Sequence, residues 1–163
     1  MKPNQIFAAM PQDRCEHVMS KISEASPDAF KQIVQSAAIA LKFRPQYLLK
    51  QPASSQIRSL RRVLARVGSG RLAEELLAIY FLKCHLELLT EWLDLLGLKH
   101  EEGILQDDVI ESPDPSEVEK HVATFRSVSE DEDRELLLQT FSAQAAIDWP
   151  ALDALVEGLA PAR

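Results

Sequence analysis

The segment from Arg71 to Leu96 constrains the fold of this chain more than any other part of the sequence. With about 3.6 residues per turn, its polar side chains gather on one narrow face, and most other positions are apolar. That face consists of Lys83, Glu87, Thr90, Glu91 and Asp94. A helix with so narrow a polar face must be covered by neighbours on most of its sides. The segment therefore predicts a long central helix of a bundle, at about 71–96.

Stretches with helical apolar spacing occupy most of the remaining chain. Apolar residues recur at i, i+3, i+4 and i+7 over residues 11–24, 26–44, 54–67 and 114–128, and each stretch opens at a proline or a capping residue. Ser129 and Glu132 have the spacing of a capping box before the apolar run 136–146. A last short helix is expected from Pro150 onward. These patterns predict about seven helices.

The expected fold class is an all-α helical bundle with no significant sheet. Residues 103–105 resemble a strand, but the sequence shows no partner strand for them. We expect a bundle core over 1–98, an acidic connector over 99–113, and a carboxyl-terminal helical subdomain over 114–163 that packs on the core. A chain of 163 residues can bury one sizeable core, so these parts are expected to form one structural domain.

Charge is distributed unevenly along the chain, whose net charge is −7. Between Lys31 and Arg71 there are nine basic residues and no acidic one, whereas from Glu74 to the end 21 acidic residues face six basic ones. In the predicted helix 54–67, apolar residues line one face and arginines another. The inner face is Ile57, Leu60, Leu64 and Val67, and the basic side chains are Arg58, Arg61, Arg62 and Arg66.

Three interpretations of these four arginines remain open. They can pair with the acidic carboxyl-terminal half, within one chain or across a dimer. They can lie along the phosphates of a nucleic acid or another polyanion. They can also form a plain solvated face, because charge runs are weak indications on their own. We favour pairing, because the chain as a whole is acidic and the loop before this helix is too long for a typical helix-turn-helix.

Residue patterns for catalysis, metal binding or cofactor binding are not found in this sequence. Cys15 and Cys84 lie too far apart for a ligand pair, and glycine-rich phosphate loops and nucleophile motifs do not occur. His85 is expected to be a neutral core histidine, and Glu117 with His121 an exposed helix pair. We therefore expect no enzyme, no metal and no cofactor.

Two classes of function remain. The first is a non-catalytic interaction or regulatory protein that presents a helical surface to a protein partner or to a second copy, with Trp92 and Leu96 as a candidate apolar interface. The second is a nucleic-acid or other polyanion-binding module that uses the arginine-rich helix. No secretory signal is visible, and the polar groups between Leu72 and Leu98 exclude a membrane span there. A cytoplasmic location without membrane contact is expected.

Overall fold

Prolines mark the beginnings of most helices, because the ring suits the first helical position and supplies no backbone N–H. Within residues 1–157, five helices begin at a proline: α1 (Pro3–Ala9), α3 (Pro27–Ala40), α4 (Pro45–Leu49), α8 (Pro115–Ser127) and α10 (Pro150–Glu157). Two more, α2 (Gln12–Ala25) and α5 (Ala53–Leu64), begin one residue after a proline. The remaining helices are α6 (Gly70–Ile79), α7 (Leu86–Leu95) and α9 (Glu132–Ser142).

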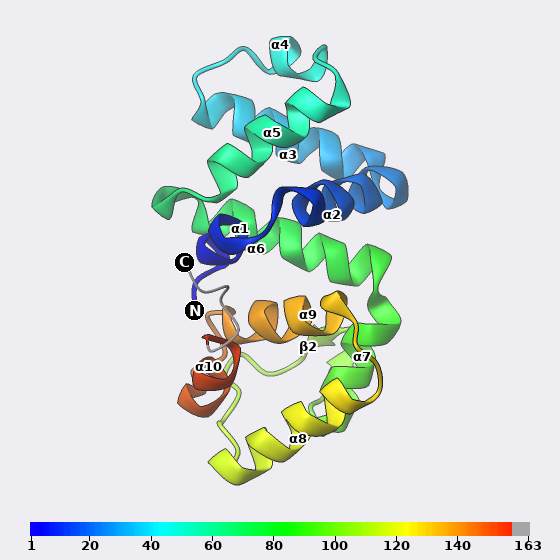
Figure 1. The fold of residues 1–163 in the computed structure, drawn as a ribbon, viewed down its shortest axis with the longest axis vertical. Coiled ribbons are helices and arrows are strands. Elements are labelled where there is room, and N and C mark those ends of the chain that lie inside the picture. The colour runs from blue at the N-terminus through cyan, green and yellow to red at the C-terminus, as the bar shows by residue number, and fades with distance from the viewer. Residues whose placement is uncertain (158–163) are drawn as a thin grey trace. The chain divides into compact units, whose positions relative to one another are not determined.

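The computed structural model describes residues 1–157 and confirms the all-α fold class (Figure 1). Ten α-helices and one two-stranded sheet occur in this described part of the chain. The predicted end of the carboxyl-terminal subdomain, 158–163, lies outside it. The chain divides into two compact units: an amino-terminal unit of residues 2–84, and a carboxyl-terminal unit that runs from His85 and also includes Met1.

The amino-terminal unit contains α1 to α6. Helix α3 packs against α2, α4 and α5, while α1 packs against α5 and α6. The buried faces of α2 and α3 follow the sequence pattern, with Cys15, Val18, Met19 and Ile22 from α2 and Phe30, Ile33, Val34, Ala37 and Ala38 from α3. Helix α1 was not expected from the sequence. Its Phe7 is fully buried in the core of this unit.

The carboxyl-terminal unit contains α7 to α10 around a column of aromatic rings. Trp92 lies 5.0 Å from Phe125 and 5.8 Å from Phe141, and Phe141 lies 5.4 Å from Trp149, between ring centroids. The indole N–H of Trp149 donates to the carbonyl of Ile110 at 3.1 Å, which fixes the acidic connector to this core. These aromatic contacts hold together helices that are far apart in the sequence.

The predicted central helix is interrupted, which corrects the expectation of one helix over about 71–96. Helix α6 ends at Ile79, a π-helical turn covers Tyr80–Cys84, and α7 begins at Leu86. His85 has left the helical region, with φ −138° and ψ 44°. It is a half-buried residue at the start of α7, and its Nε2 lies 3.5 Å from a carboxylate oxygen of Asp133. The boundary between the two compact units falls at this interruption.

Two further expectations are corrected. Val67 is 86 % exposed and does not line the inner face of α5, because the helix ends at Leu64 and Arg66 is extended, with ψ 145°. The strand-like residues near Gly103 do have a partner: β2 (Ile104–Leu105) pairs antiparallel with β1 (His100–Glu101). A two-residue turn joins them, and both of its residues, Glu102 and Gly103, have positive φ.

Candidate polyanion-binding surface

Helix α5 carries the arginines that the sequence singled out. Its apolar face, with Ile57, Leu60, Val63 and Leu64, is buried, so the opposite face must point outward. Arg58 and Arg62 lie one turn apart on that outward face, about 6 Å along the axis. Arg66 follows just beyond the end of the helix.

Arg58, Arg62 and Arg66 are all exposed, and we call them the arginine ridge. Within residues 2–84, none of the three forms an ion pair or a hydrogen bond with another side chain. We expected carboxylates to neutralise these arginines, but no carboxylate of their own unit pairs with them. Pairing with acidic residues of the other unit or with a second copy stays a prediction.

Arg61 has a different role from its neighbours. It is half-buried, and its Nη2 donates to the backbone carbonyl of Met10 at 2.9 Å. This bond ties α5 to the link between α1 and α2. Burial raises the pKa of the nearby Cys15 thiol to about 11, and the positive charge of Arg61 opposes that rise. Arg61 thus stabilises the scaffold that presents the arginine ridge.

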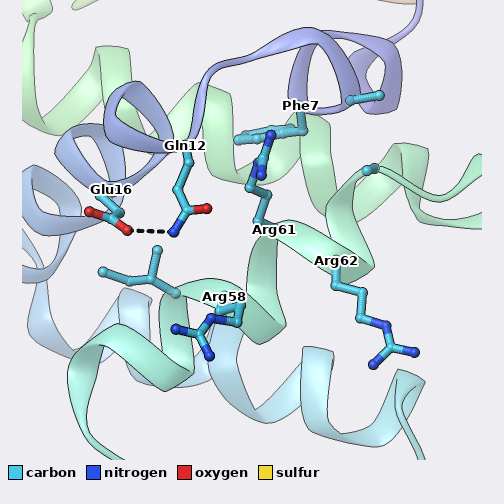
Figure 2. Close-up of a pocket in the computed structure, with 9 residues that line it drawn as sticks. Phe7, Gln12, Glu16, Arg58, Arg61 and Arg62 are labelled. Atoms are coloured by element: carbon cyan, nitrogen blue, oxygen red, sulfur yellow. Dashed lines mark hydrogen bonds between the residues drawn. The ribbon is translucent and has the colours of Figure 1, made fainter.

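A small pocket of about 240 Å³ lies beside the ridge (Figure 2). Side chains of α1, α2 and α5 line it, with Phe7 and Ile57 among the apolar ones. Figure 2 shows Arg58 and Arg62 extending in different directions. The only carboxylate in the lining is that of Glu16, which accepts a hydrogen bond from the amide of Gln12 at 3.0 Å. The lining is therefore mainly basic and apolar.

The charge of the whole unit agrees with this local pattern. Residues 2–84 contain 13 Lys and Arg against six Asp and Glu, a net charge of +7. Residues 85–163 contain five Lys and Arg against 19 Asp and Glu, a net charge of −14. The acidic average of the full chain thus conceals a strongly basic unit, in which the arginine ridge lies.

The candidate apolar interface divides into a core residue and a partly covered one. Trp92 is fully buried, so its ring belongs to the aromatic column and is not available to a partner. Leu96 is half-buried at the end of α7. Three exposed apolar residues of the amino-terminal unit were not predicted from the sequence as interface candidates: Ile39, Phe43 and Tyr47. The signal available in the sequence was two aromatic residues interleaved with Lys42 and Arg44.

Comparison of the chain with protein families, with curated protein sequences and with solved structures found no match. Within residues 1–157, no helix is both long enough and apolar enough to cross a bilayer. The same part of the chain holds no group of three or more His, Cys, Asp or Glu side chains arranged to bind a metal ion. Charge and geometry therefore carry the functional proposal.

Proposed function

We propose that the amino-terminal unit is a non-catalytic module that binds a polyanion, with nucleic acid as the natural target. The observation that carries this proposal is the exposure of Arg58, Arg62 and Arg66 without a carboxylate partner inside their unit. A surface guanidinium of this kind can donate two hydrogen bonds to a phosphate. The net charge of +7 over residues 2–84 supports the same conclusion.

The length of the ridge suits a phosphate backbone. Arg58 and Arg62 lie about 6 Å apart along the helix axis, and Arg66 follows in extended backbone beyond the end of the helix. Each strand of a duplex carries one phosphate per about 3.4 Å of axis, so Arg58 and Arg62 together span about two phosphates. Binding should release about one counterion for each phosphate that is neutralised.

The salt dependence of binding tests this proposal. Fluorescence anisotropy of a labelled duplex DNA at increasing salt gives the slope of log K against log salt concentration. Each lost phosphate contact should reduce that slope by about 0.9. The double variant Arg58→Gln/Arg62→Gln should therefore flatten the slope by about two and weaken binding at low salt.

A charge-matched control separates the ridge from the bulk charge of the unit. Lys21 and Lys31 are exposed on α2 and α3, away from the ridge in the sequence. Lys21→Gln/Lys31→Gln removes the same charge and should change the slope less. Equal effects of the two double variants would indicate nonspecific attraction to the unit. Absence of binding to duplex DNA, single-stranded DNA and heparin at low salt would refute polyanion binding altogether.

A protein partner or a second copy of the chain is the alternative, and the exposure of Phe43 and Tyr47 favours it. Light scattering after size exclusion tests self-association directly, and a monomer at high concentration would exclude the dimer. For location we propose the cytoplasm, which the two free cysteines, Cys15 and Cys84, support.

A further inference from the structure

We infer that the polyanion is a single-stranded nucleic acid and that its unpaired bases stack on an aromatic tip formed by Ile39, Phe43 and Tyr47. This inference rests on the proposed function and names the target of the same unit. It adds a second element, aromatic stacking, to the phosphate contacts of the arginine ridge.

The tip is apolar and open to solvent. Ile39 is 68 % exposed, Phe43 44 % and Tyr47 58 %. The two rings meet edge to face, with centroids 5.8 Å apart and planes at 67°. Such a contact covers one face of one ring, so the pair leaves further ring faces uncovered. An uncovered aromatic face is the surface on which single-stranded nucleic-acid binders stack bases.

Basic residues flank the two aromatic residues in the sequence. Lys42, Arg44 and Lys50 are all exposed, and they alternate in the sequence with Phe43 and Tyr47. No acidic residue occurs between Lys31 and Arg71 to neutralise them. A nucleotide offers a flat base and a charged phosphate side by side. Along the sequence of the tip, aromatic residues likewise alternate with basic ones.

The backbone at Lys42 adds an independent observation. Helix α3 ends in a Schellman motif, in which the N–H of Phe43 donates to the carbonyl of Ala38 at 2.8 Å and the N–H of Lys42 donates to that of Ile39 at 3.0 Å. This motif requires a left-handed residue, usually glycine, yet Lys42 occupies it with φ 60°. Lys42 thus has a strained backbone, and phosphate contact by its ammonium group would give a lysine a role at this position.

The tip is joined directly to the helix that carries the ridge. The Nε2 amide of Gln56 in α5 donates to the carbonyls of Leu49 and Gln51, each at 3.0 Å. These bonds hold the end of α4 against Gln56, which lies two residues before Arg58 in α5. Figure 1 shows α4 at one end of the amino-terminal unit, next to the ends of α3 and α5. The proposed strand would contact the tip and continue toward the ridge.

A single strand fits these features better than a duplex or an acidic protein. In a duplex the base faces are stacked on one another, so exposed rings would gain nothing from it. An acidic peptide would use the cations but has no flat rings to match uncovered aromatic faces. Stacking of a base on these rings should tighten binding about tenfold, which corresponds to about 1.4 kcal/mol.

The test uses the full chain and two labelled strands of equal length, oligothymidine and an abasic strand, with the same phosphates. Oligothymidine should bind about tenfold more tightly than the abasic strand. Phe43→Leu/Tyr47→Leu keeps the apolar bulk and removes the ring faces. This variant should bind oligothymidine about tenfold more weakly and the abasic strand unchanged, with an unaltered thermal midpoint by circular dichroism.

Each other outcome separates the two proposals. Equal binding of both strands, weakened by Arg58→Gln/Arg62→Gln, would retain polyanion binding and refute stacking. Binding of neither strand would refute the single-stranded target, and only the further failure of duplex DNA and heparin to bind would refute polyanion binding. Two results together would identify an acidic protein as the partner and refute the nucleic-acid target. Polyglutamate would displace oligothymidine, and the Phe43→Leu/Tyr47→Leu variant would bind oligothymidine as tightly as the wild type.

Discussion

Removing either partner of the Arg134–Glu91 pair should destabilise the carboxyl-terminal unit. The side chain of Arg134 is only 8 % exposed and makes two bonds to the carboxylate of Glu91, at 2.8 and 2.9 Å. It also donates to the carbonyl of Phe125 at 3.0 Å and to the hydroxyl of Ser129 at 3.1 Å. Its guanidinium lies 4.5 Å from the centroid of the Phe125 ring.

The expected loss in free energy of unfolding depends on which polar groups each substitution leaves without a partner. Arg134→Met leaves the Phe125 carbonyl buried without a donor, which costs about 1–3 kcal/mol. The Glu91 carboxylate is 41 % exposed, so water rehydrates it and limits the further loss. We expect about 2–4 kcal/mol in total. Glu91→Gln leaves a buried guanidinium without a counter-charge and should cost about 3 kcal/mol or more. The double variant should lose less than the sum.

Urea unfolding followed by tryptophan fluorescence measures these losses. The chain has two tryptophans, Trp92 and Trp149, and both lie in the carboxyl-terminal unit. Arg126→Met is the comparison, because Arg126 and its partner Glu135 are 28 % and 34 % exposed, so solvent screens that pair more and its removal should cost less than removal of Arg134. A loss below about 0.5 kcal/mol for Glu91→Gln would show that the carboxylate does not stabilise the buried arginine.

Three further predictions concern other positions. Burial raises the pKa of Cys15 from 9.0 to about 11, so its neutral thiol favours the folded state below pH 9.0. This contribution to stability, up to about 2–3 kcal/mol, is lost as pH rises through about 11. Thermal melts of wild type and Cys15→Ala across this pH range should therefore diverge. Lys42→Gly should raise stability by about 1 kcal/mol in urea unfolding followed by circular dichroism, yet weaken binding of oligothymidine; a loss of stability would contradict the strain. Glu102→Asn, at φ 49° in the hairpin turn, should stabilise the carboxyl-terminal unit by roughly 0.5 kcal/mol in tryptophan-monitored unfolding, and a destabilised variant would count against this turn geometry.

Helical periodicity predicted the buried faces because burial repeats with the helical turn. The α8 residues Val118, Val122 and Phe125 are buried as their spacing indicates. The cap of α9 was displaced by two residues from the predicted Ser129. Asp131 is the residue whose side chain accepts from the N–H of Asp133, at 2.9 Å, while Ser129 bonds Arg134 instead. Local spacing allowed both caps, and a contact from a buried arginine decided between them.

The interruption at His85 and the aromatic tip could not be predicted in the same way. A pattern of apolar residues continues smoothly from α6 into α7, because a π-helical turn adds a residue without changing composition. For the candidate site, the sequence indicated which residues are basic but not which are uncovered. Exposure of Phe43 and Tyr47 depends on how α3 ends and where α4 then lies, which is a tertiary property.

The opposite charges of the two units affect how this chain behaves during chromatography. A sequence pI of about 5.1 suggests that only an anion exchanger would retain the protein at neutral pH. Residues 2–84 carry a net charge of +7, however, so this part of the molecule can also bind a cation exchanger. Retention on a heparin or phosphocellulose column is therefore expected despite the low pI. The pI of the whole chain is therefore a poor guide to which columns retain a protein with oppositely charged units.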